Sequence, residues 1–282
     1  MDQNLEQISR PTPSTQFLIF NLFGDYIMPR GGRIWTPDLL YLLDLLGVSE
    51  RAARSTLSRM KKRGWFTTHR DGRQSRYDLT PAGRAICEAG NQRIFEPPLE
   101  NWDGQWHLVV YSLPEEMRKI RNEVRKKLIW FGYGNLAPGT WIAPHDRHKE
   151  LEPSLIELGV QQYVDLFSGE HIGVTSDEAL VHRCWDLEEI AAAYRVFFEK
   201  HRLQYEHFCA NWNHAKPTAA ETFSYRFWLT YEFQQFPRLD PNLPIELLPD
   251  GWIGYKARQM FKDFRELLNQ EVQPFLDKLI SA

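Results

Sequence analysis

Long basic side chains cluster in one short stretch of this sequence. Residues 48–84 contain ten lysines and arginines against three acidic residues, a local balance of +7. The whole chain carries −3 and residues 1–47 carry −2, so residues 85–282 must carry −8. A short basic segment on an acidic body indicates a confined surface that binds a polyanion.

These basic residues fall on a predicted helix and a predicted hairpin. Residues 50–63 repeat apolar side chains at helical spacing, which leaves the basic ones on the opposite face. Residues 65–70 and 74–79 predict two strands, joined by the turn sequence Asp71-Gly72-Arg73. Arginine binds guanine or phosphate through two parallel hydrogen bonds, and serine hydroxyls reach bases or phosphates. We therefore predict that double-stranded DNA is bound by Ser49, Arg51, Arg54, Ser55, Ser58, Arg59, Lys62, Arg70, Arg73, Gln74 and Arg76.

The same pattern also fits a solvated basic helix in a domain that binds only proteins. The hairpin favours DNA, because an interaction domain does not need four long polar side chains there. Those of Arg70, Arg73, Gln74 and Arg76 suit phosphates or an adjacent minor groove. Which arginine contacts a base stays open at this point.

A second polar group lies in the loop 144–149, where His145, Asp146, Arg147, His148 and Lys149 follow one another closely. The histidines and the aspartate are of types that bind metal ions, whereas the two cations suit the phosphates of a ligand. A solvated loop with Asp146 capping the next helix explains the same residues. Further along, aromatic residues at helical spacing form either a core or an apolar pocket.

Motifs of catalysis are missing from the chain. There is no glycine-rich phosphate loop, no nucleophile elbow and no pair of catalytic carboxylates in a known motif. We predict no catalytic residue, no bound metal and no enzymatic activity.

The elements that must position these groups divide the chain into three parts. Residues 14–95 predict a winged helix-turn-helix DNA-binding domain. Residues 100–180 follow the order β-α-β-β-α-β, with a further short strand at 171–174, and predict a ferredoxin-like middle domain. Residues 181–282 predict an α-helical C-terminal domain. The fold class is α+β, with residues 1–13 as a disordered arm and 96–99 as a linker.

Composition indicates the class of protein and where in the cell it is expected. With 43% hydrophobic and 25% charged residues, the chain has the make-up of an ordinary folded protein. No apolar run is long enough for a membrane helix, and the N-terminus lacks the apolar region of a secretion signal. The three cysteines lie far apart, which argues against a disulfide framework. We expect a cytoplasmic protein without a membrane partner.

Motifs along nearly the whole chain resemble those of PaaX-type transcriptional regulators. They are VSERAARSTLSRM at 48–60, KRGW at 62–65, YDLTPAG at 77–83, WDG at 102–104, SLPE at 112–115, LAPGTWI at 136–142, LDPNLP at 239–244, LLPDGW at 247–252 and Ala257-Arg258. The proline-rich motifs near the C-terminus are the most specific of these.

The resemblance implies a function and its partners. It implies a homodimeric repressor of aromatic acid catabolism, of the phenylacetate type, that binds palindromic operator DNA. An aryl-CoA thioester such as phenylacetyl-CoA would act as the effector that releases the DNA, and no cofactor is implied. On their chemistry, we assign Trp141, His145, Arg147, His148, Lys149, Arg226 and Trp228 to the effector.

Two other functions remain as alternatives. The resemblance implies a middle domain similar to small CRISPR-adaptation nucleases, which hold a metal with an aspartate at the end of the first strand. Here that strand ends Tyr111-Ser112-Leu113, without a carboxylate, so the metal chemistry is not expected. A DNA-bound scaffold without an effector is the other alternative, favoured if no aryl-CoA alters DNA binding.

Overall fold

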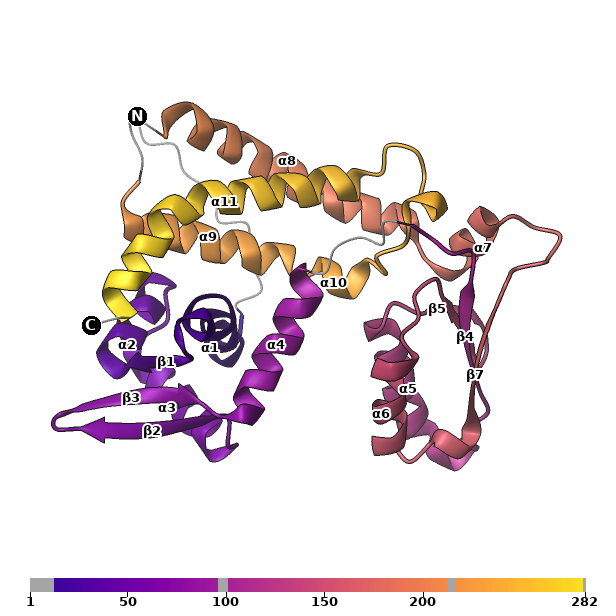
Figure 1. Ribbon diagram of the computed structural model, residues 1–282, viewed down its shortest axis with the longest axis horizontal. Helices are drawn as coiled ribbons and strands as arrows, with labels where there is room; N and C mark the ends of the chain where they lie inside the picture. Colours follow the sequence, from indigo (N-terminus) through magenta and orange to yellow (C-terminus); the bar gives the residue numbers. More distant parts are fainter. Residues whose placement is uncertain (1–12, 96–100, 213–216, 281–282) are drawn as a thin grey trace. The chain divides into compact units, whose positions relative to one another are not determined.

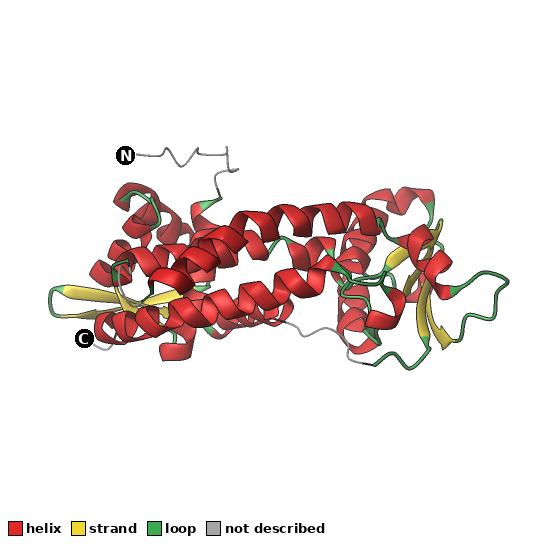
Figure 2. Cartoon of the chain, turned by 90° about the horizontal axis from the view of Figure 1, so that it is seen from above, coloured by secondary structure: helices red, strands yellow, loops and turns green. Residues whose placement is uncertain are grey.

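The computed structural model of this chain describes residues 13–95, 101–212 and 217–280. These residues form a mixed α/β structure with two small antiparallel sheets and helices over most of the remainder (Figure 2). The predicted linker 96–99, and the predicted arm 1–13 apart from Pro13, lie outside the described residues.

Two compact units make up the chain, and each is assembled from stretches that are far apart in the sequence. The first unit comprises Met1–Phe95, Asn213–Tyr231 and Arg265–Ala282, whereas the second comprises Glu96–Trp212 and Glu232–Phe264. The domain boundaries that we derived from the sequence stay a prediction. They divide the chain into continuous segments, whereas the two units group residues that lie close together in space.

The first unit combines short helices with a three-stranded sheet (Figure 1). Its elements are α1 (Thr15–Leu22), a π-helix (Phe23–Ile27), a 3-10 helix (Met28–Arg30), β1 (Arg33–Trp35), α2 (Thr36–Leu45), α3 (Glu50–Lys62), β2 (Phe66–Asp71), β3 (Gln74–Leu79) and α4 (Pro81–Phe95). The strands are ordered β1-β3-β2, with antiparallel pairs throughout. The predicted helix over 50–63 and the predicted hairpin are thereby confirmed.

Local sequence explains how α3 is held. Gly47 has φ +79°, a left-handed conformation that glycine adopts without strain, and it turns the chain sharply after α2. Ser49 then caps α3, because its hydroxyl accepts a hydrogen bond from the amide of Ala52. Ala53, Leu57 and Met60 are each 0% exposed and fix the inner face of the helix in the core.

The core of the first unit also takes side chains from two helices that come much later in the chain, α9 (Ala219–Phe233) and α11 (Ile253–Ile280). Their contributions are the buried side chains of Phe223, Phe227, Val272 and Leu276. The ring of Tyr26 meets that of Phe223 edge-on, with 5.2 Å between the centroids. The N-terminal elements therefore share one core with C-terminal helices.

A buried ion cluster accompanies this core. Asp25, in the π-helix after α1, accepts hydrogen bonds from Arg226 of α9 at 2.9 and 3.3 Å. Arg265 of α11 donates to the same carboxylate at 2.9 Å. The two guanidinium groups lie over aromatic rings, Arg226 over Tyr26 at 4.6 Å and Arg265 over Phe95 at 4.3 Å. One carboxylate thus joins three helical segments.

The second unit holds a four-stranded sheet and the remaining helices. Its elements are β4 (Trp106–Tyr111), a 3-10 helix (Glu115–Met117), α5 (Arg118–Trp130), β5 (Gly134–Ala137), β6 (Thr140–Ala143), α6 (His148–Glu157), a 3-10 helix (Gln161–Tyr163), β7 (Val164–Gly169), α7 (Asp177–Cys184), α8 (Leu187–Asn211), α10 (Phe236–Leu239) and a 3-10 helix (Ile245–Leu247). The strand order is β5-β6-β4-β7, all antiparallel. Figure 1 shows α5 and α6 side by side on one face of this sheet. Val109 of β4, Val124 of α5 and Leu151 of α6 meet in their shared core.

Some predicted elements differ from the structure. The strand expected at 171–174 is wrong, because that segment is irregular and exposes Ile172 and Val174 almost fully. Strand β1 and helix α7 were not predicted. β1 has only three residues, too few to display alternation, and it forms because β3 offers a free edge. Among the described residues, no helix combines the length and apolarity needed to cross a bilayer.

We expect the variant Asp25→Asn to lower the free energy of unfolding by about 3–5 kcal/mol, because it leaves two buried guanidinium groups without a counter-charge. Burial alone would raise the pKa of Asp25, but Arg265 and Arg226 hold it below its ordinary 3.8. A group whose pKa is depressed in the folded state stabilises above its unfolded pKa and loses that effect in acid. The difference between wild type and variant should therefore shrink below about pH 4, as measured by urea unfolding.

Asp277→Asn provides the matched control. Asp277 forms an ion pair with Arg30 at 2.7 Å, but its side chain is 64% exposed. Arg30 is 13% exposed but keeps its hydrogen bonds to the Tyr26 carbonyl and to Gln273, so losing the exposed charge of Asp277 should cost less than about 1 kcal/mol. Equal losses in the two variants would show that Asp25 holds no special place in the fold.

Candidate nucleic-acid interface

Four of the predicted DNA-binding residues form one row along the outer face of α3. Arg51, Ser55, Ser58 and Lys62 are all exposed, and their spacing of four, three and four residues places them on one side of a helix. The row lies opposite the buried Ala53, Leu57 and Met60. In the part of the chain that the structure describes, neither Arg51 nor Lys62 has an acidic partner. We call these four residues the outer row.

The other polar residues of α3 lie on its two flanks. On one flank, Arg54 forms an ion pair with Glu50 at 2.7 Å, and the ammonium of Lys61 donates to the Thr68 hydroxyl of β2 at 2.5 Å. Arg59 and Arg63 occupy the other flank. Arg59 donates to the Thr56 hydroxyl at 3.0 Å, within the helix, while Arg63 donates to Gln16 of α1 at 3.3 Å. The flanks thus hold the helix to its neighbours and leave the outer row to solvent.

The hairpin adds cations next to this helix. Arg70 and Gln74 are exposed on β2 and β3, and Arg73 is exposed in the turn after Gly72, whose φ is +56°. Arg76 differs from them, because it is half-buried and its guanidinium lies 3.2 Å from the Asp78 carboxylate. The charge of Arg76 is therefore already balanced within the hairpin.

Sequence reasoning missed two basic side chains in this region. Lys61 links α3 to the hairpin, and His69 lies 3.2 Å from Asp78, directly across from Arg76. The signal for His69 was the hairpin register, and the contact of Lys61 with Thr68 depends on how α3 packs beside β2; a single sequence shows neither directly. Ser49, predicted to bind DNA, lies at the start of α3, and its hydroxyl is engaged in capping the helix.

Tyr77 lies beneath these charges on β3. Burial raises its pKa above the ordinary 10.0, while the positive charge of Arg54 opposes the rise. The phenol is therefore neutral at neutral pH, and the net charge of the surface comes from its arginines and lysines.

Five of the residues assigned to the effector lie in the second unit. Trp141 is buried in β6, and Nε2 of the buried His145 lies 2.7 Å from the backbone carbonyl oxygen of Asn242. Arg147 is 3.7 Å from Glu150, and Lys149 is exposed. His148 pairs with Asp146 at 2.5 Å, a hydrogen bond that lowers the pKa of that carboxyl. Across the described ranges, no group of three or more His, Cys, Asp or Glu residues could hold a metal ion.

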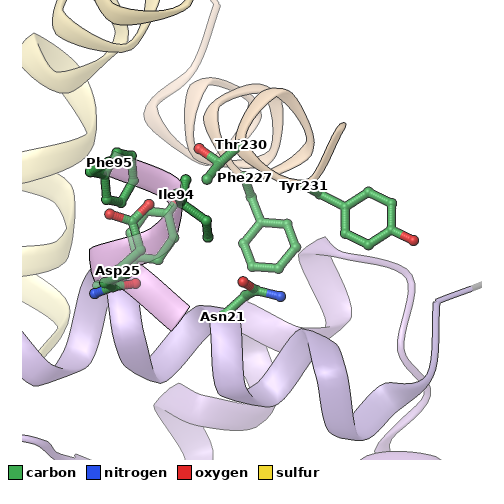
Figure 3. A pocket seen from close by; sticks show the side chains of 9 residues that line it. Asn21, Asp25, Ile94, Phe95, Phe227, Thr230 and Tyr231 are labelled. Carbon is green, nitrogen blue, oxygen red and sulfur yellow. The ribbon is translucent and has the colours of Figure 1, made fainter. Parts of the chain in front are cut away.

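The other two assigned residues, Arg226 and Trp228, lie in the first unit. Arg226 is 2% exposed and its guanidinium is bound to Asp25, while Trp228 packs edge-on against Phe227 and Tyr231. A cavity lies beside this cluster, between Asp25, Phe95 and Thr230 (Figure 3). Its volume of about 10 Å³ is about the least that holds one water molecule, so an aryl group does not fit there.

Comparisons with known proteins give matches along most of the chain. Residues 14–83 match the family described as "PaaX-like protein", residues 99–181 the "PaaX protein central Cas2-like domain", and residues 185–278 the "PaaX-like protein C-terminal domain". The Escherichia coli (strain K12) protein named "Transcriptional repressor PaaX" is 34% identical over 247 residues, which span 86% of this chain and 77% of that protein.

A solved structure shares the fold. The "Uncharacterized protein Rv0674 from Mycobacterium tuberculosis" superposes with a TM-score of 0.62 at 18% sequence identity, over 93% of this chain and 98% of that one. At this identity the likeness concerns the fold alone. The three sequence matches and the 34% identity decide the family, and this chain belongs to the PaaX-type transcriptional regulators.

Proposed function

We propose that this protein is a transcriptional repressor that binds operator DNA through α3 and the β2–β3 hairpin. The observation that carries the proposal is the outer row, which presents Arg51 and Lys62 to solvent without acidic partners among the described residues. Exposed cations on one helix face favour a polyanion as ligand, and duplex DNA admits a helix into its major groove. The name of the E. coli relative, a transcriptional repressor, supports the same function.

The arrangement supports a winged helix-turn-helix. Helix α2, the Gly47 turn and α3 would form the helix-turn-helix, and the hairpin would form the wing. Arg51, Ser55, Ser58 and Lys62 would enter the major groove. Arg70, Arg73 and Gln74 would contact phosphates or the adjacent minor groove, whereas Arg76 would contribute least because Asp78 neutralises it.

We infer that the middle of the chain is ferredoxin-like and that the protein acts as a homodimer. The strand order β5-β6-β4-β7, with α5 and α6 on one face, supports the first inference. The second follows from the usual symmetry of such repressors, whose two DNA-binding domains read the halves of a palindrome. Among the described residues, β7 lies at an edge of its sheet and exposes Leu166 and Phe167.

The proposed effector is an aryl-CoA thioester such as phenylacetyl-CoA, which would release the repressor from genes of aromatic acid catabolism. The effector must bind the released state more tightly than the DNA-bound state, because a ligand shifts an equilibrium only by its difference in affinity. We propose no enzymatic activity, a view that the repressor name of the E. coli relative supports.

Titration of the DNA upstream of the protein's own gene with the pure protein, followed by fluorescence anisotropy, tests this function. We expect specific binding that phenylacetyl-CoA weakens and CoA alone does not. If the protein binds this DNA no better than a random duplex, the repressor function fails for this site. If binding is specific but insensitive to every aryl-CoA, a DNA-bound scaffold is the better description.

In the same titration, Arg51→Ala should weaken operator binding by about 1–3 kcal/mol, because the outer row loses a side chain that can bind a base or a phosphate. Circular dichroism should show an unchanged fold, since Arg51 is exposed. Arg195→Ala is the control, because Arg195 is an exposed arginine of α8 in the second unit. Unchanged affinity of the Arg51 variant would remove the outer row from the interface.

Arg73→Ala tests the hairpin. If Arg73 contacts only phosphate, its loss should weaken binding about equally for operator and random DNA, and should reduce the slope of log K against log salt by about 1. Arg73→Lys keeps the charge and should keep the slope. A loss confined to the operator would instead assign Arg73 to base recognition.

A further inference from the structure

The second unit contains a pocket of about 460 Å³, formed by four separate stretches of chain. Pockets for small ligands commonly measure about 300–1,000 Å³, so this volume admits an aryl group with room to spare. The cavity beside Asp25 in the first unit is far smaller, and neither Arg226 nor Trp228 lines it. The larger pocket includes Trp141 and none of the other six residues that sequence reasoning assigned to the effector.

Aromatic and aliphatic side chains form part of the wall of the pocket. Tyr133, Trp141 and Trp185 line it together with Ile129 and Ile190. Trp185 can lie against β5 because Gly134 has no side chain, and a Cβ there would come within 2.6 Å of the indole. Burial, the main cause, raises the pKa of Tyr133 to about 12, so this part of the wall carries no charge at neutral pH.

One polar group in this wall has no partner. Trp141 is 3% exposed, and its indole N–H makes no hydrogen bond within the described residues. A buried donor without an acceptor costs about 1–3 kcal/mol and is rare in native proteins. An acceptor on a bound ligand, such as the carbonyl oxygen of an acyl group, would satisfy it after a small shift of the ring.

The rim of the pocket is charged. Its lining includes Arg125 of α5, Arg238 of α10, and Asp186 and Glu189 near the start of α8, where Asp186 is engaged in capping that helix. Asp240 also lines the pocket, but it is buried and already bound by Arg258 at 3.0 Å and by the Tyr194 hydroxyl at 2.6 Å. The carboxylates of the rim balance its two arginines, so the rim alone does not select an anion.

Helix α5 supplies the excess positive charge. It has six basic residues and one acidic residue, although residues 85–282 as a whole are acidic. Arg118, Asn122, Arg125 and Ile129 share one face at helical spacing, and the last two reach the pocket. Arg118 and Arg125 are exposed and about 10 Å apart along the axis, a separation that suits a chain of phosphates.

We propose that this pocket holds the aryl group of an acyl thioester whose phosphorylated carrier extends along α5 over Arg125 and Arg118. The proposal rests on the effector part of the proposed function, and it adds where on the protein the effector binds and which residues bind it. The free acid shares the aryl and acyl groups but lacks the phosphates, and CoA shares the phosphates but lacks the ring. Comparing the three ligands therefore separates the two halves of the site.

Calorimetric titration of the full chain with phenylacetyl-CoA, CoA and phenylacetate tests the proposal. Arg125→Glu should weaken the binding of phenylacetyl-CoA and of CoA by about tenfold or more, and it should leave the affinity for phenylacetate unchanged. Ile129→Glu places a charge against the aryl ring. It should weaken the binding of phenylacetyl-CoA and of phenylacetate by about tenfold or more, and it should not change the affinity for CoA. Both positions are exposed, so the variants should fold.

Each variant has a matched control. Lys126 is the next residue of α5, is exposed and does not line the pocket. Ile156 of α6 is 55% exposed against 51% for Ile129, and it does not line the pocket. Lys126→Glu and Ile156→Glu should bind all three ligands within about twofold of wild type.

The outcomes distinguish this pocket from the proposed function. If wild type binds phenylacetyl-CoA and both pocket variants bind it equally well, the pocket is overturned while the effector stands. If Lys126→Glu weakens CoA binding as much as Arg125→Glu does, the phosphates respond to the overall charge of α5. The assignment of the phosphates to Arg125 and Arg118 is then overturned. If wild type binds no thioester, the pocket and the effector both fail, and DNA binding by the outer row is untouched.

Discussion

The carboxylate of Asp25 is the point on which the first unit depends. It binds Arg226 and Arg265 at 2.9 Å each, and its side chain is only 13% exposed. Desolvating three charges is costly, and the cost is recovered only when all of them are in place with good geometry. The cluster therefore favours one arrangement of the π-helix, α9 and α11 over looser packings of the same apolar side chains.

The π-helix gives this carboxylate its direction. An α-helix continued from α1 would place residue 25 at a different angle, and the wider turn over Phe23–Ile27 redirects the side chains that follow. Tyr26 and Ile27 still reach the core, where they are almost completely buried. A local departure from ideal geometry thus serves the ion cluster and the apolar core together.

The parts of the protein that could be predicted from sequence are those with local causes. The outer row follows from helical periodicity within 50–62, and the hairpin follows from Asp71-Gly72, whose turn type needs a glycine. Asp25 could not be identified, because its partner Arg226 lies 201 residues away. Arg226 was accordingly assigned to an effector on its residue type alone. The pocket of the second unit could not be predicted for the same reason, because α5, β6, α8 and α10 come together only in the folded chain.

The order in which the chain is made bears on this architecture. A ribosome adds about 5–20 residues per second, so Asp25 leaves it roughly 10–50 s before Arg265, which is 240 residues further along. For most of that interval, Tyr26 lacks Phe223, and the N-terminal helices lack part of their core. The candidate DNA-binding surface is therefore synthesised first and completed last. A nascent chain stalled before α11 would carry the basic residues without the framework that holds them, and it would be a substrate for chaperones.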